Sequence, residues 1–171
     1  YFMPVFMFMK MDDVAGDSKN YQHEGWSDVQ SWHWEMTSNR QPVPADTEAK
    51  TAFNEISLVK LVGMDSMAIR SFYAAGTIIP TVKLNIIPAV GKREAKQKYL
   101  FLQMEDVLVK SISTGGNVDD DVFTETITLL FARVHFAYNA HTPITAENPA
   151  GTSKEYTFAW DIAANKALTA G

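Results

Sequence analysis

In residues 98–112, KYLFLQMEDVLVKSI, the alternation of apolar and polar residues changes phase, and this change indicates the class of fold. Successive side chains of a β-strand point to opposite faces of its sheet. The apolar residues of this stretch occupy even positions at first and odd positions afterwards: Leu100, Leu102 and Met104, then Val107 and Val109. A change of phase within one strand indicates a bulge or a sharp bend, which is how a sheet turns the corner of a barrel.

Residues 122–138, VFTETITLLFARVHFAY, change phase in the same way. Their apolar positions switch parity after the first half: Ile127, Leu129 and Phe131, then Val134, Phe136 and Tyr138. The glycine-containing turn STGGNVDDD, residues 113–121, joins the two stretches. We therefore predict a long, strongly bent hairpin within a small β-barrel.

The rest of the chain predicts further strands and one helix. Apolar residues alternate with polar ones over residues 82–86 and 155–162, and residues 53–61 form another candidate strand. The apolar opening YFMPVFMFMK also reads as a strand. A helix is expected from an N-cap at Asp65 to Gly76, and its apolar stripe would face the sheet: Ile69, Phe72 and Tyr73. With 171 residues and no internal repeat, the chain is predicted to be one mainly β domain spanning residues 1–171.

Three of the four tryptophans lie in WSDVQSWHWEM, residues 26–36. In a strand, Trp32, Trp34 and Met36 share one face, whereas His33 and Glu35 share the other. His33 and its flanking tryptophans therefore cannot contact one ligand together. We interpret the cluster as part of the barrel wall, with a sugar-stacking platform as the alternative.

Composition excludes several classes of function. The net charge of -5 provides no basic surface that could neutralise nucleic-acid phosphates. The absence of cysteine excludes disulfides, thiolate metal sites and a cysteine nucleophile. The opening residues lack the basic segment of a signal peptide and are too short to span a membrane, so export without a conventional signal peptide is expected.

No catalytic or metal-binding pattern is present. The four histidines, His23, His33, His135 and His141, lack metal-ligand spacing and are expected to be solvated or to lie on a sheet face. Asp119, Asp120 and Asp121 lack the alternating ligands of a calcium loop, and Ser113-Thr114-Gly115-Gly116 is not followed by the lysine of a phosphate-binding loop. We predict no enzymatic activity, no cofactor and no bound metal.

Five segments in order resemble one family. They are FMKMDDVAGDS, GWSDVQSWHWEM, the helix-bearing stretch up to Gly76, YLFLQMEDVLVKSISTGG and EYTFAWDIAANKA. Together they resemble the haemolysin-coregulated proteins (Hcp), the inner-tube proteins of the bacterial type VI secretion machine. The likeness runs from about residue 6 to residue 167.

The resemblance implies a two-sheet β-barrel with a flanking helix and an extended loop, related to the tail-tube subunits of contractile phages. It also implies a homohexameric ring with a wide lumen, whose rings stack and are expelled from the cytoplasm of a Gram-negative cell. In that family no residue is catalytic, and the lumen can hold effector proteins. The partners implied are other copies of the chain, other type VI components and effectors.

The polar excursion of residues 37–52, TSNRQPVPADTEAKTA, is too charged to join a core. Its prolines, Pro42 and Pro44, hold the chain extended. We predict that residues 38–52 contact a neighbouring subunit or ring through a salt-sensitive surface: Arg40, Asp46, Glu48 and Lys50.

Two rival hypotheses remain at this point. A monomeric binding module would use Trp26, Trp32 or Trp34 to bind a carbohydrate or a similar ligand. A hydrolase would assemble its site only in the fold, in a cleft that contains a perturbed acid or base. The native mass separates a hexamer near six times 19.1 kDa from both rivals.

Overall fold

The computed structural model describes residues 5–38, 42, 51–88, 100–142 and 152–168. Its elements follow in the order β1 Val5–Met11, β2 Ser27–His33, β3 Met36–Ser38, β4 Thr51–Phe53, β5 Ile56–Leu61, α1 Asp65–Ala75, β6 Ile79–Pro88, β7 Leu100–Gly115, β8 Thr124–Leu130, β9 Arg133–Thr142, β10 Thr152–Asp161 and β11 Lys166–Ala167.

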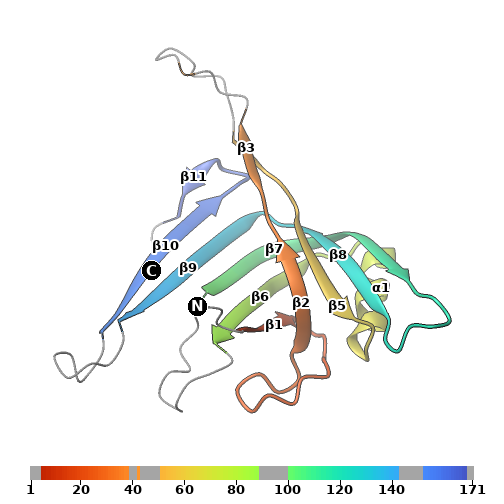
Figure 1. The fold of residues 1–171 in the computed structure, drawn as a ribbon. Helices are drawn as coiled ribbons and strands as arrows, with labels where there is room; N and C mark the ends of the chain where they lie inside the picture. Colours follow the sequence, from red (N-terminus) through yellow and green to blue (C-terminus); the bar gives the residue numbers. More distant parts are fainter. Residues whose placement is uncertain (1–4, 39–41, 43–50, 89–99, 143–151, 169–171) are drawn as a thin grey trace.

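Six strands close into a barrel (Figure 1). They are hydrogen-bonded in the order β7-β6-β1-β2-β5-β8, and the barrel closes because β8 pairs with β7 as well as with β5. Strands β9, β10 and β11 extend the sheet outward from β7. Among the described residues, the short strands β3 and β4 form a separate two-stranded sheet. The predicted small β-barrel with one flanking helix is confirmed.

The predicted bend lies at Asp106. Its φ of 52° is in the left-handed region, where an aspartate tolerates the strain better than most residues. Before this residue β7 pairs with β9, and after it β7 pairs with β8. The backbone N–H of Ala132 donates to the carbonyl of Glu105 at 3.0 Å, where the second stretch breaks between β8 and β9. The first stretch therefore bends as one strand, whereas the second divides into two strands.

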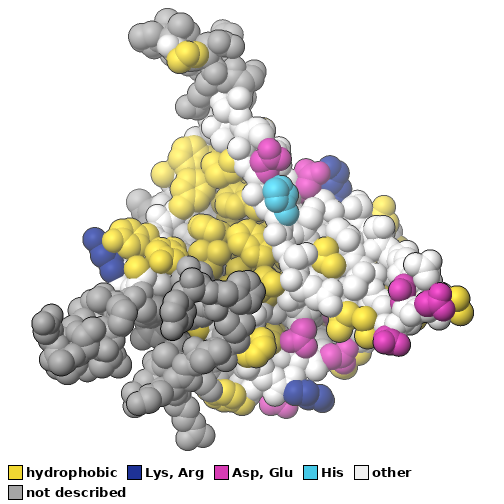
Figure 2. Space-filling view, in the orientation of Figure 1, with side chains coloured by type: hydrophobic (Ala, Val, Ile, Leu, Met, Phe, Trp, Pro, Cys, Tyr) yellow, Lys and Arg dark blue, Asp and Glu magenta, His cyan; other side chains and the backbone are white. Residues whose placement is uncertain are grey.

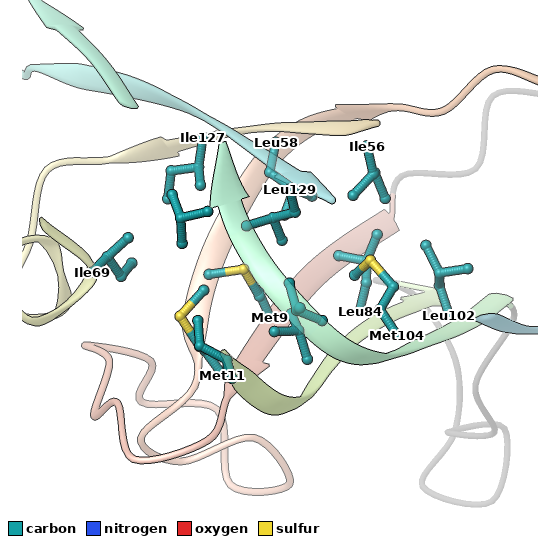
Figure 3. Packing of buried hydrophobic residues seen from close by; sticks show 14 of the residues in the cluster. Met9, Met11, Ile56, Leu58, Ile69, Leu84, Leu102, Met104, Ile127 and Leu129 are labelled. Carbon is teal, nitrogen blue, oxygen red and sulfur yellow. The ribbon is translucent and has the colours of Figure 1, made fainter. Parts of the chain in front are cut away.

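The core fills the barrel with aliphatic and methionine side chains (Figure 3). Residues from both halves of the bent β7 point into it, because the change of phase at Asp106 restores the inward direction after the bend: Leu102, Met104, Val107 and Val109. From α1, Ile69 is fully buried against this cluster. Each buried side chain of this size stabilises the fold by about 1.5–3 kcal/mol.

Helix α1 ends as predicted but begins differently. Gly76 closes it with a φ of 64°, and its N–H bonds back to the last turn. The N-cap is Met64, which makes no side-chain capping bond, so the predicted N-cap at Asp65 is wrong. Asp65 is the first helical residue, and its carboxylate points inward to the buried Lys60. Tyr73 is 49% exposed, so of the predicted stripe Ile69 and Phe72 pack on the barrel, together with Ala68.

The strand predicted over residues 53–61 is interrupted. Residues 54 and 55 separate β4 from β5, because Asn54 bonds to the neighbouring segment and not along a ladder. Its N–H donates to the carbonyl of Glu35 at 3.1 Å, and its own carbonyl accepts the indole N–H of Trp34 at 3.0 Å. The chain therefore leaves the β3–β4 ladder at this point and enters the barrel wall as β5.

Candidate functional site

The β3–β4 ladder, at the base of the polar excursion, projects from the barrel (Figure 1). Its pairs are Met36 with Phe53, Thr37 with Ala52 and Ser38 with Thr51. The base of the excursion is thus regularly paired, and Pro42 beyond it is exposed. The four predicted contact residues, Arg40, Asp46, Glu48 and Lys50, lie outside the described residues.

The tryptophans are part of the packing of the barrel. Trp32 and Trp34 are half-buried against the core, and both rings lie about 6 Å from the ring of Phe136. The indole N–H of Trp34 donates a hydrogen bond to the backbone carbonyl of Asn54. His33 is exposed on the opposite face, as the alternation predicts. Met36 does not join the wall, because it lies in the separate strand β3 and is 45% exposed. The packing of Trp32 and Trp34 argues against a sugar-stacking platform.

The histidines differ in burial. His23, in the segment between β1 and β2, is only 5% exposed, so it is not solvated, and it lies against the sheet at the Phe8–Asn85 pair of β1 and β6. Its ring stacks on Phe8 at 4.5 Å, and its Nε2 lies 3.0 Å from the amide nitrogen of Asn85. His135 is half-buried on β9, while His141 lies in β9 with a side chain outside the described part. Among the described residues, no group of three or more potential ligands could hold a metal ion.

The most concentrated chemistry is a buried charge cluster, formed by Lys60, Asp65, Glu125 and the serines beside them. Lys60 Nζ lies 2.9 Å from Asp65 Oδ1 and 2.9 Å from Glu125 Oε1, and all three side chains are at most 2% exposed. Arg70 reaches the other oxygen of Glu125 at 2.9 Å. The hydroxyls of Ser66 and Ser27 donate to Glu125 and Asp65, respectively. This cluster ties the first turn of α1 to β2, β5 and β8.

The surroundings of Glu125 favour its charged form. Burial raises the pKa of Glu125, but the hydrogen bonds from Ser66, Lys60 and Arg70 and the charge of Lys60 outweigh it and lower that pKa below the ordinary 4.5. Lys60, Asp65 and Glu125 are buried, whereas Arg70 is 34% exposed. The arrangement therefore suits a structural tie between α1 and the barrel.

Sequence reasoning missed this cluster, although a signal was present. Lys60 has the same parity as Ile56 and Leu58, and Glu125 has the parity of Ile127 and Leu129, so both charges point inward with the core. In the β5–β8 ladder the two residues are directly opposite each other. Charged residues at inward positions of two strands predict a buried pair once the strands are known to be neighbours.

A groove of about 590 Å³ lies on the outward face of the β9–β10 sheet. Its lining includes the apolar Phe101, Ala137 and Ala159 together with His135 and Glu155. The Nε2 of His135 lies 3.8 Å from Glu105 Oε1. In the described part of the chain, no helix is long and apolar enough to cross a membrane.

Comparison with known proteins finds a match to one family model and to one curated relative, and both belong to the Hcp proteins. The family model described as "Type VI secretion system effector, Hcp" matches residues 8–138. Protein hcp1 of Pseudomonas aeruginosa is 31% identical over 138 residues, which is 80% of this chain and 84% of that protein.

Solved structures share the fold. Hcp1 from Salmonella typhimurium superposes with a TM-score of 0.76 at 23% identity, over 97% of this chain and 100% of that one. A structure described as a type six secretion system protein gives a TM-score of 0.78 at 22% identity, over 96% and 100% of the two chains. A type VI secretion system effector from Yersinia pestis gives 0.62 at 20% identity, over 88% and 98%.

Proposed function

Because this chain belongs to the Hcp family of type VI secretion proteins, we propose that it is a structural subunit of a secretion tube and not an enzyme. In this proposal, copies of the chain form a hexameric ring, the rings stack into a tube, and the tube is expelled by the type VI machine. The match of residues 8–138 to the family model carries the proposal.

The site chemistry supports a structural function. The charges that the fold buries, Lys60, Asp65 and Glu125, are paired with one another and with Arg70, and they fasten the helix to the barrel. Of the tryptophans that could serve a binding module, Trp32 and Trp34 are packed against Phe131 and Phe136, and Trp26 contacts the ring of His23. The buried charges and the packed tryptophans thus stabilise the fold, which suits a subunit that transmits force along a tube.

The native mass of the purified chain tests the ring. Sedimentation at several protein concentrations should give a species near six times 19.1 kDa, and negative-stain images should show rings with an open centre. A chain that stays monomeric at every concentration would contradict the proposal. Smaller effector proteins that co-purify with rings, and are lost when the rings dissociate, would identify the lumen as their carrier.

The polar excursion is assigned to contacts between subunits or rings. Support comes from the β3–β4 ladder, which forms a sheet separate from the barrel at the base of the excursion, and from the charge of Arg40, Asp46, Glu48 and Lys50. Such a wet, charged interface weakens as salt screens it. Ring stacking should therefore fall with increasing ionic strength.

Replacing residues 40–50 with a short Gly-Ser linker tests this assignment. We expect rings or their stacks to be lost while the barrel still unfolds cooperatively. Because the chain has no cysteine, single cysteines at Ala45 or Thr47 can also be oxidised against one on the opposite ring face, and stacked rings should give a ladder of multiples. Rings and tubes that form normally without the excursion would refute its role.

A further inference from the structure

The β9–β10 hairpin extends the inward face of the sheet beyond the barrel. Along β9 this face passes from the fully buried Val134 to the half-buried Phe136. On β10, Trp160 and Phe158 are half-buried, and Tyr156 further out is 52% exposed. Polar residues would be expected where a strand leaves its core, yet this face remains aromatic. Figure 2 shows hydrophobic side chains gathered on this side of the molecule.

Lys154 gives the outer end of the hairpin a positive edge. Its Nζ lies 4.9 Å from the centre of the Tyr156 ring, which stacks on Tyr138 at 6.4 Å. Lys154 and Tyr156 share the inward parity of β10. Among the described residues of this face on β9 and β10, no carboxylate is present. We call Lys154, Tyr156 and Phe158 the hairpin patch.

The opposite end of the barrel carries a second exposed apolar surface, which we call the helix patch. Met64 and Met67 on the outer side of α1 are 63% and 62% exposed, and Phe123 nearby is 49% exposed. The N–H of Val62 donates to the carbonyl of Phe123, so the segment leading into α1 lies beside the β7–β8 turn. The charged residues of α1, Asp65 and Arg70, are both engaged in ion pairs with the barrel. The outer side of the helix therefore presents methionines and no unpaired charge.

The helix patch has a negative edge. The β7–β8 turn contains Asp119, Asp120 and Asp121, all exposed. Arg70 ties α1 to both strands that flank this turn, through Thr114 on β7 and Glu125 on β8. The acidic turn and the helix patch therefore belong to the same end of the molecule, opposite the hairpin in Figure 1.

We infer that the hairpin patch of one copy seats on the helix patch of the next copy, with Lys154 facing the acidic turn. This inference rests on the proposed ring and identifies the two surfaces through which neighbouring subunits contact each other. A ring requires two different, complementary surfaces on opposite sides of each subunit, because each contact is heterologous. The two patches differ in chemistry, lie at opposite ends and carry opposite edge charges. Aromatic and methionine side chains are also those that interface cores favour, and exposed apolar patches of this kind mark interaction sites.

Two acidic substitutions test the pairing in the full chain. Tyr156→Glu places a negative charge in the hairpin patch, and Met67→Glu places one in the helix patch next to the acidic turn. Each should raise the protein concentration at which half the rings dissociate by about tenfold or more. The control is Thr157→Glu, which makes the same kind of change at the next residue of β10, on the opposite face of the sheet. Far-UV circular dichroism and the urea midpoint establish that each variant is folded.

Cross-linking identifies which surfaces meet. Cysteines at residues 156 and 67 of one chain should be joined by a short bismaleimide into a ladder of multiples, whereas either cysteine alone should leave single chains. Dimers formed by one cysteine alone would show a like-with-like contact and overturn the inference. Acidic variants that both form rings at the wild-type concentration, or a double-cysteine chain that forms rings but gives no ladder, would overturn it as well. A wild-type chain that never forms rings would instead refute the proposed function itself.

Discussion

Replacing the buried Lys60 should lower the stability of the protein far more than replacing an exposed lysine that lies equally close to a carboxylate. Lys60→Met takes away the cation that lies 2.9 Å from each of two buried carboxylates, while keeping most of the side-chain volume. Glu125 retains Arg70, whereas the buried carboxylate of Asp65 loses its cation and keeps the hydrogen bond from the hydroxyl of Ser27. Breaking a buried pair in this way costs about 3–5 kcal/mol.

That cost is a large fraction of the roughly 5–15 kcal/mol that stabilises a typical domain. In a chain of this size it corresponds to a fall in Tm of roughly 6–20 °C. Urea unfolding followed by tryptophan fluorescence should show a lower midpoint with an unchanged slope. All variants must be compared at one protein concentration, because assembly itself stabilises the folded state.

The matched control is Lys110→Met. Lys110 Nζ also lies 2.9 Å from a carboxylate oxygen, that of Glu55, but the two side chains are 49% and 37% exposed. Water and salt screen this pair, so its loss should leave Tm within error of the wild type. The double variant Lys60→Met/Asp65→Asn should recover part of the loss, because the orphaned charge is gone. Equal effects of Lys60→Met and Lys110→Met would refute the reasoning.

Three further outcomes are expected. Trp34→Ala should cost about 3 kcal/mol in urea unfolding, the low end for a buried aromatic, because its ring is half-buried; an unchanged midpoint would contradict its place in the wall. Asp106→Ala should be about 1–2 kcal/mol less stable than Asp106→Gly, since both lose the carboxylate and only alanine is strained at a φ of 52°; equal stabilities would contradict a backbone role. The lowered pKa of Glu125 adds stability that is fully present above pH 4.5 and is lost as the pH falls through the pKa of Glu125 in the folded protein. Glu125→Gln should therefore flatten the pH dependence of the urea midpoint below pH 4.5.

The sequence by itself determined the barrel and its bends. Alternation has a period of two in any strand, so the direction of each side chain follows from local backbone geometry. The change of phase between Met104 and Val107 therefore predicted the bend that the structure places at Asp106. The same alternation separated His33 from its flanking tryptophans. Gly76 marked the end of α1, because a left-handed residue after a helix favours glycine.

Only the tertiary structure decided which inward residues meet. Lys60 and Glu125 are 65 positions apart, and they pair because β5 and β8 become neighbours when the barrel closes. That pairing explains why Asp65 turns inward to Lys60 and leaves the N-cap to Met64. It also places Met64 and Met67 on the outer side of the molecule, opposite the hairpin that carries Tyr156. Register and closure depend on contacts between distant segments, whereas parity depends only on the next residue along the chain.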